Sequence, residues 1–148
     1  NILPLYGVFE NGSAVCLILE YASGGDLLKY CYEHKGRCIK EETTIIFVRG
    51  FLKALKYLHS KGVVHRDIKL ENFVITNTGV KLIDFGVSID NNLERPVSAV
   101  GTSAYMPPEV VSCPLKRFPS EFKDHTELHY GPAADIWSVG VLVWELLT

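Results

Sequence analysis

Four side chains that could carry out chemistry lie close together in one polar part of the sequence. Asp67, Lys69 and Asn72 fall within the octapeptide His-Arg-Asp-Ile-Lys-Leu-Glu-Asn, and Asp84 follows seventeen residues after Asp67. Phosphoryl transfer needs metal ions held by oxygen ligands, a fixed positive charge and a group that orients the attacking hydroxyl. Two carboxylates, an amide and an ammonium group at this spacing therefore indicate phosphoryl-transfer chemistry.

The elements on either side of the octapeptide must hold it in place. Apolar residues recur at three- and four-residue steps between Glu41 and Lys61, which predicts an amphipathic helix with one buried stripe. The predicted stripe consists of Ile45, Val48, Leu52, Leu55 and Leu58. Short apolar runs at residues 73–75 and 80–83 predict a small hairpin. The octapeptide is then a loop between a helix end and a hairpin, and Asp84 directly follows a strand.

Other segments predict further elements around this centre. Residues 3–9 and 14–21 are rich in branched and aromatic side chains, and Asn11-Gly12 between them favours a hairpin turn. Asp26 is a good N-cap for a short helix over 27–35. Residues 84–130 show no periodicity and predict a long irregular stretch of the functional kind. A last helix is expected to start near residue 132.

The octapeptide and the Asp-Phe-Gly at 84–86 together resemble the eukaryotic protein kinases. The resemblance implies that Asp67 accepts the proton of the substrate hydroxyl and that Lys69 neutralises charge on the transferred phosphoryl group. It implies that Asn72 and Asp84 hold the Mg²⁺ ions that bridge the phosphates of ATP. A lysine at position 69 is similar to the Ser/Thr kinases, whereas tyrosine kinases usually carry a different loop there. His65 and Phe85 resemble residues that stack on each other in the active state.

Two more segments match the same family. Residues 101–109, Gly-Thr-Ser-Ala-Tyr-Met-Pro-Pro-Glu, resemble the end of a kinase activation segment, and Pro107 replaces the commoner Ala as in Aurora-type kinases. Residues 135–140 resemble the helix whose Asp135 bonds the main chain of the catalytic loop. Within the activation segment, Ser98 is expected to be phosphorylated and to pair with Arg66. Thr102 is expected to contact the catalytic loop through its hydroxyl.

The nucleotide site is implied by the same resemblance. Glu20 and Ala22 fall at the hinge, where main-chain groups would bind adenine, and Leu19 falls at the gatekeeper position. Asp26 would meet the ribose, and Val74 would form the floor under the adenine. Together with Asp84 these residues are the predicted ATP-binding residues.

The resemblance implies an α+β, two-lobe protein-kinase fold, present here as a partial domain over residues 1–148 and truncated at both ends. Residues 1–21 would be two strands of the N-terminal lobe and the hinge, and 22–148 the mostly helical C-terminal lobe up to the helix after the activation segment. The sequence shows no glycine-rich phosphate loop or strand lysine of this family. The 148 residues alone are therefore expected to be inactive. Residues 112–130 are interpreted as an insertion, either a solvated loop or a contact for a partner or substrate.

The implied activity is transfer of the γ-phosphate of Mg-ATP to Ser or Thr hydroxyls of protein substrates by the parent protein. One alternative is a catalytically inactive kinase-like scaffold that binds partner proteins, which the intact Asp67, Lys69, Asn72 and Asp84 argue against. A second alternative is a small-molecule kinase such as the aminoglycoside phosphotransferases. It is disfavoured by Arg66, Lys69, the Asp-Phe-Gly at 84–86 and the Pro-Pro-Glu at 107–109.

Composition excludes other classes of function. There are 15 basic and 17 acidic residues, a net charge of −2, and no basic run, so neither nucleic acid nor a membrane surface is an expected partner. The four cysteines, Cys16, Cys31, Cys38 and Cys113, lack the spacing of a disulfide framework. Free thiols predict a reducing, intracellular location, in the cytoplasm or the nucleus. Cys31, His34 and Cys38 lack a convincing fourth ligand for a metal site.

Overall fold

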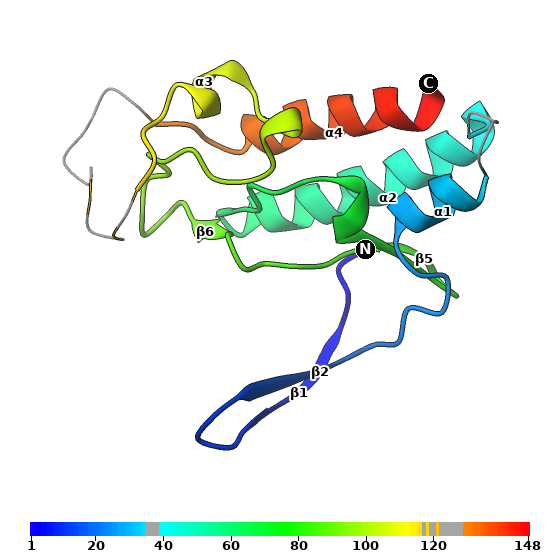
Figure 1. Cartoon of the computed structure of the whole chain (residues 1–148), viewed down its shortest axis with the longest axis horizontal. Helices are drawn as coiled ribbons and strands as arrows, with labels where there is room; N and C mark the ends of the chain where they lie inside the picture. The colour runs from blue at the N-terminus through cyan, green and yellow to red at the C-terminus, as the bar shows by residue number, and fades with distance from the viewer. Residues whose placement is uncertain (35–38, 117, 119–120, 122–128) are drawn as a thin grey trace.

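The computed structural model describes residues 1–34, 39–116, 118, 121 and 129–148, and it shows a mixed α+β arrangement. Two long helices, α2 (Glu41–Ser60) and α4 (Ala133–Leu147), pack against each other. Figure 1 shows them stacked, with the other elements around them. The other helices, 3-10 turns included, are α1 (Leu27–Glu33), η1 (Leu70–Asn72), η2 (Ser103–Tyr105) and α3 (Pro108–Val111). The strands are β1 (Leu5–Glu10), β2 (Val15–Leu19), β3 (Val63–Val64), β4 (Phe73–Thr76), β5 (Gly79–Leu82) and β6 (Ile89–Asp90).

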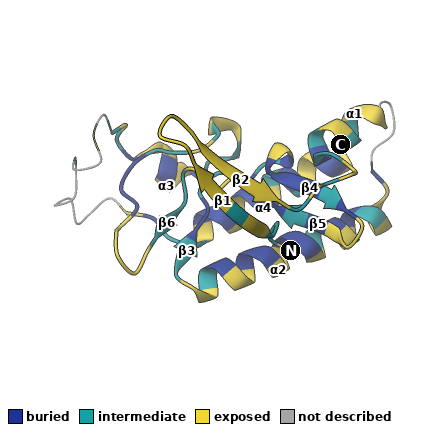
Figure 2. Ribbon diagram, turned by 90° about the horizontal axis from the view of Figure 1, so that it is seen from below, coloured by how far each residue is buried: buried dark blue, intermediate teal, exposed yellow. Residues whose placement is uncertain are grey.

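Every sheet in the described part of the chain is a two-stranded antiparallel pair: β1 with β2, β3 with β6, and β4 with β5. The β1–β2 hairpin extends away from the helices in Figure 1. Its side chains are almost all exposed, as the yellow ribbon in Figure 2 shows. The mixed α+β class and both predicted hairpins are therefore confirmed.

Local chemistry explains where the helices begin and end. The carboxylate of Asp26 accepts a hydrogen bond of 2.8 Å from the main-chain N–H of Lys29, so Asp26 is the N-cap of α1 as predicted. Glu41 and Glu42 occupy the first turn of α2, where the helix dipole favours negative charge. Gly62 follows α2 at a φ of +77°, a conformation that costs glycine little and other residues more.

The main core lies between α2, α4 and the β4–β5 hairpin. Phe51 of α2 and Phe73 of β4 are fully buried, and their ring centroids are 4.2 Å apart. Leu142 of α4 is also fully buried in this cluster. This core supports the loop 65–72, because the loop begins directly after the short strand β3, ends in η1 and leads into β4.

The buried face of α2 differs from the predicted stripe. Leu55 and Leu58 are buried as expected, but Ile45 and Leu52 are 43% and 44% exposed. The face that packs on α4 and β5 instead consists of Thr44, Phe47, Gly50, Phe51, Ala54, Leu55 and Leu58. The aliphatic periodicity identified the helix correctly, but it gave the wrong centre for the buried face because it left out Phe47 and Phe51, which are both buried.

The stretch 84–130 is less irregular than the sequence indicated. It contains the strand β6, the 3-10 turn η2 and the short helix α3. These elements are two to four residues long, too short for a periodic pattern to reveal. Cys38, considered above with Cys31 and His34 as a metal ligand, lies outside the described residues. The described cysteines, Cys16, Cys31 and Cys113, are free thiols.

Within the described residues, no helix is long and apolar enough to cross a membrane.

Candidate active site

Asp135, in the first turn of α4, fixes the main chain of the loop 65–72. The Asp135 carboxylate accepts hydrogen bonds from the main-chain N–H of His65 at 3.0 Å and of Arg66 at 2.9 Å. Its Oδ2 also lies 2.8 Å from Nε2 of His59, near the end of α2. Asp135 is 1% exposed, so its bond to His65 joins two buried groups and the other two bonds are partly buried. The predicted contact of Asp135 with the catalytic-loop main chain is confirmed.

Three of the predicted catalytic side chains meet at one carboxylate. Oδ2 of Asp67 lies 2.8 Å from Nζ of Lys69 and accepts a hydrogen bond of 3.0 Å from Nδ2 of Asn72. The same Asn72 amide donates to the carbonyl oxygen of Asp67 at 2.7 Å, which closes the loop on itself. The structure therefore brings together the carboxylate, ammonium and amide groups that the spacing predicted.

Thr102 adds a hydroxyl to this cluster from the activation segment. Its Oγ1 donates to Oδ1 of Asp67 at 2.7 Å and accepts from Nζ of Lys69 at 3.0 Å. The close approach depends on Gly101, which has a φ of +115° and packs against the carbonyl oxygen of Arg66. A Cβ at position 101 would collide with that oxygen. The predicted contact of Thr102 with the catalytic loop is confirmed.

The cluster keeps Asp67 ionised. Burial alone would raise the pKa of Asp67, but hydrogen bonds from Lys69, Thr102 and Asn72, together with the Lys69 charge, hold the pKa below its ordinary value. The hydrogen bond with Asp67 raises the pKa of Lys69, against a smaller opposing effect of burial. Lys69 is therefore a fixed positive charge next to a fixed negative one, and the carboxylate is in the form that can accept a proton.

The Asp84-Phe85-Gly86 segment lies beside His65. The ring centroids of His65 and Phe85 are 5.2 Å apart in an edge-on arrangement, as the resemblance implied. His65 is fully buried and its Nε2 lies 3.0 Å from the carbonyl oxygen of Ile83; burial lowers its pKa and keeps the ring neutral. Asp84 itself is exposed and has a φ of +61°. Such strained backbone at a non-glycine residue persists where the surroundings enforce it, and often at functional sites.

Asp84 and Asn72 fit the ligand chemistry of Mg²⁺. Asn72 donates through Nδ2 in both of its side-chain bonds, which leaves its amide oxygen available as a ligand. Asp84 is solvent-accessible, and its charge acts on Lys69 and His65. In the described residues no group of three or more His, Cys, Asp and Glu side chains is arranged to hold a metal. Mg²⁺ usually takes one or two carboxylates and completes its coordination with phosphate oxygens and water, and this is the role predicted for Asp84 and Asn72.

A largely apolar cavity of about 630 Å³ opens between the β1–β2 hairpin and the β4–β5 hairpin. It is lined by Leu3, Leu5, Leu17, Leu19, Val74, Leu82, Ile83, Asp84, Phe85 and Gly86. Val74, Leu19 and Asp84, the predicted adenine floor, gatekeeper and magnesium ligand, therefore share one cavity. Its size and apolar lining are typical of a small-molecule site.

The remaining predicted nucleotide residues lie outside the lining of this cavity. Glu20 forms an ion pair with Lys81 of β5, with Oε2 and Nζ 2.6 Å apart. Asp26 caps α1 and pairs through its main chain with Val74. Ala22 is half-buried, in a turn closed by the N–H of Gly25. The contacts of Glu20, Ala22 and Asp26 with a nucleotide stay predictions.

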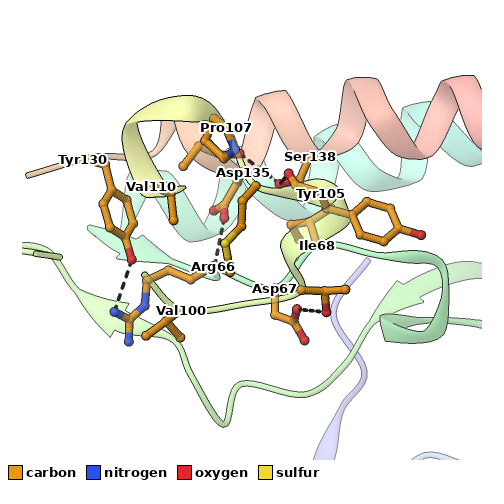
Figure 3. A pocket seen from close by; sticks show the side chains of 13 residues that line it. Arg66, Asp67, Ile68, Val100, Tyr105, Pro107, Val110, Tyr130, Asp135 and Ser138 are labelled. Atoms are coloured by element: carbon orange, nitrogen blue, oxygen red, sulfur yellow. Dashed lines mark hydrogen bonds between the residues drawn. The ribbon is translucent and has the colours of Figure 1, made fainter. Parts of the chain in front are cut away.

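Arg66 makes contacts that the sequence did not suggest (Figure 3). Its Nε donates to the carbonyl oxygen of Val87 at 2.6 Å, and its Nη1 donates to the hydroxyl of Tyr130 at 3.5 Å. That hydroxyl donates in turn to the carbonyl oxygen of Ser98 at 2.9 Å. Ser98 is 5% exposed, so the phosphorylation expected there would require this part of the segment to open. Phosphorylation of Ser98 stays a prediction.

Tyr130 is the residue that sequence reasoning missed. It was placed at the end of a solvated insertion, yet it is 5% exposed and packs with Val110, Cys113 and Ala134 in a second apolar cluster. Of the two interpretations of residues 112–130, the solvated loop is wrong at Cys113 and Tyr130, and the contact for a partner or substrate stays a prediction. Residues 117, 119–120 and 122–128 lie outside the described part. A large aromatic residue just before a helix was the available signal.

Comparison with known proteins agrees with this geometry. The family model described as "Protein kinase domain" matches residues 1–148. An Aurora kinase of Schizosaccharomyces pombe is 40% identical over 148 residues, which are 99% of this chain and 37% of that protein. Aurora kinase A-A of Xenopus laevis is 37% identical over 150 residues, 99% of this chain and 32% of that protein. Serine/threonine-protein kinase ULK1 of Homo sapiens is 33% identical over 160 residues, 100% of this chain and 14% of that protein.

The Aurora kinases among these relatives confirm the similarity that Pro107 and the activation segment indicated. The chain spans about a third of the length of the two Aurora kinases. The match to the kinase model extends from the first residue to the last, and it includes the loop 65–72, the Asp-Phe-Gly segment and the helix of Asp135. This chain belongs to the protein kinase domain family.

Proposed function

We propose that the protein containing this chain transfers the γ-phosphate of Mg-ATP to Ser and Thr hydroxyls of protein substrates. The observation that carries the proposal is the Asp67 carboxylate, which Lys69, Asn72 and Thr102 hold in a single cluster. Membership of the kinase family and the Ser/Thr kinases among the relatives support the same activity. Residues 1–21 would belong to the smaller lobe and hinge, and 22–148 to the larger lobe.

Each residue of the cluster has a distinct part in the reaction. The substrate hydroxyl oxygen forms a bond to the γ-phosphorus as the bond from that phosphorus to the leaving ADP oxygen breaks, and the hydroxyl proton passes to Asp67. Lys69 balances the negative charge on the transferred phosphoryl group. Asn72 and Asp84 would hold Mg²⁺, which neutralises the charge of the phosphate oxygens when it is bound. Thr102 aligns Asp67 through its hydroxyl.

The nucleotide would enter the cavity next to Val74. Val74 and Leu19 provide apolar surface for the adenine ring, and main-chain groups of Glu20 and Ala22 would bind its polar edge. Asp26 would contact the ribose. The ion pair between Glu20 and Lys81 ties the end of β2 to β5, which fixes the hinge end of the cavity.

The decisive experiment is Asp67→Asn in the full-length protein. Loss of a general base typically lowers turnover about 10²- to 10⁴-fold, whereas ATP binding measured by calorimetry should remain. Asp84→Asn should instead weaken Mg-dependent nucleotide binding. Asp90→Asn, at the half-buried last residue of β6, is the matched control and should leave both measurements unchanged. Wild-type kcat for Asp67→Asn on a protein substrate would contradict the role given to Asp67. A full-length wild-type protein that is inactive with all substrates would favour the scaffold function.

A further inference from the structure

Tyr130 is a buried titratable residue that none of the phosphoryl-transfer steps uses. It is 5% exposed, and its main chain and side chain both bond to the same part of the activation segment. The N–H of Tyr130 donates to the carbonyl oxygen of Pro96 at 3.2 Å, and its hydroxyl donates to the carbonyl oxygen of Ser98 at 2.9 Å. Tyr130 therefore holds two carbonyl groups that lie two residues apart.

The segment around Ser98 is buried on its other side as well. Val97 and Ser98 are 2% and 5% exposed. The N–H of Ala99 donates to the carbonyl oxygen of Pro114 at 3.0 Å, just after α3. Residues 96–99 thus lie between Tyr130 and the end of α3, and the segment has main-chain bonds to both.

The Tyr130 hydroxyl also connects this segment to the catalytic loop. It accepts a hydrogen bond from Nη1 of Arg66 at 3.5 Å, and Figure 3 shows the guanidinium group next to the hydroxyl of Tyr130. Burial raises the pKa of Tyr130, against the opposing charge of Arg66, so the hydroxyl keeps its proton and can donate to Ser98 while it accepts from Arg66. The main chain of Arg66 is itself fixed by Asp135.

The connection reaches the reacting carboxylate through only four residues of chain. Three residues after Ser98 lies Gly101, which packs on the carbonyl oxygen of Arg66, and the next residue is Thr102, which bonds to Asp67. If the Ser98 end of this stretch is free, Thr102 loses one of the supports that keep it at Asp67. Arg66 meets a neutral hydroxyl here, so the arrangement needs no phosphate group.

We propose that Tyr130 is a positioning residue that anchors residues 96–99 to Arg66 and thereby keeps Thr102 at Asp67 in protein that carries no phosphate on its activation segment. The anchor uses the carbonyl oxygen of Ser98 and not its side chain, so it is independent of the Ser98 hydroxyl. The kinetic part of this proposal rests on the proposed function, but the structural part does not.

The test is Tyr130→Phe in the full-length protein after phosphatase treatment, because this change removes only the hydroxyl. Hydrogen–deuterium exchange of the amides in residues 96–102 should become about three- to tenfold faster, the range expected for the loss of one buried hydrogen bond. The kcat for a peptide substrate should fall, whereas the KM for ATP should stay constant because the ATP cavity does not include Tyr130. A merely structural defect would instead raise exchange throughout the chain.

Two control variants separate the outcomes. Tyr57→Phe alters an exposed tyrosine on α2, and Ser98→Ala keeps the carbonyl that Tyr130 binds. Both should show wild-type exchange in residues 96–102. The proposal is overturned if Tyr130→Phe exchanges like the wild type there, or if Ser98→Ala accelerates exchange as much as Tyr130→Phe. If the protein transfers no phosphate at all, the exchange data alone still decide whether Tyr130 anchors the segment.

Discussion

The Asp135 carboxylate offers the sharpest test of how this site is held together. It is 1% exposed and accepts bonds from two main-chain N–H groups of the catalytic loop and from the ring of His59. Asp135→Ala removes all of these acceptors at once. The two N–H groups, on His65 and Arg66, would then be left without a partner in the interior.

The expected loss of stability follows from those two groups. A buried donor left without an acceptor costs about 1–3 kcal/mol, so the pair on His65 and Arg66 costs about 2–6 kcal/mol. His59 adds little, because its side chain is 18% exposed and can bond to water. A loss of this size is a large part of a typical domain stability of about 5–15 kcal/mol. Asp135→Asn keeps one acceptor oxygen and should cost about half as much.

The measurement is the free energy of unfolding of the full-length protein in urea, provided that the kinase domain unfolds in a separate transition. The midpoint should fall with an unchanged m value, since a shift of the midpoint alone reports stability. Asp90→Asn is the matched control, because Asp90 also accepts from a main-chain N–H, that of Asn92 at 2.9 Å, but at an exposed position. Water can replace that bond, so the control should lose less than about 1 kcal/mol. An Asp135→Ala protein within about 0.5 kcal/mol of the control would refute the reasoning.

Three further predictions concern the catalytic cluster. Thr102→Ala should lower kcat on a peptide substrate about 10- to 100-fold, because it removes a hydrogen bond to the charged Asp67. Thr102→Ser keeps the hydroxyl and should keep most of the activity, so equal rates for the two variants would contradict the prediction. Gly101→Ala should cost about 1–3 kcal/mol of stability and lower kcat, because Gly101 has a φ of +115° and an added Cβ would collide with the carbonyl oxygen of Arg66. An unchanged melting temperature would count against this prediction. The pKa of Asp67 is held below 3.8, so the ionised carboxylate contributes stability above its unfolded-state pKa, and that contribution is lost as the pH falls through the folded value. The difference in unfolding free energy between wild type and Asp67→Asn should therefore be constant from about pH 5 to 8 and shrink only in more acidic solution, and a change near neutral pH would be inconsistent with it.

The sequence by itself determined the family and indicated which groups are the candidates for the reaction. Asp67, Lys69 and Asn72 lie within six residues of chain, and a loop between a helix end and a hairpin can bring them together without help from distant segments. The N-cap Asp26 and both hairpins are local in the same way, because neighbouring residues decide them. Short-range spacing is therefore sufficient to predict these features.

Only the tertiary structure decided which surfaces are buried and which distant residues support the site. Ile45 and Leu52 share the helical period of the buried residues, but the position of α4 and β5 leaves them exposed. Asp135 was expected at the catalytic loop from the resemblance alone, since nothing in its local sequence points to a partner some seventy residues away. Tyr130 went unrecognised for the same reason: its partners, Arg66 and Ser98, are far away along the chain, and only packing brings them together.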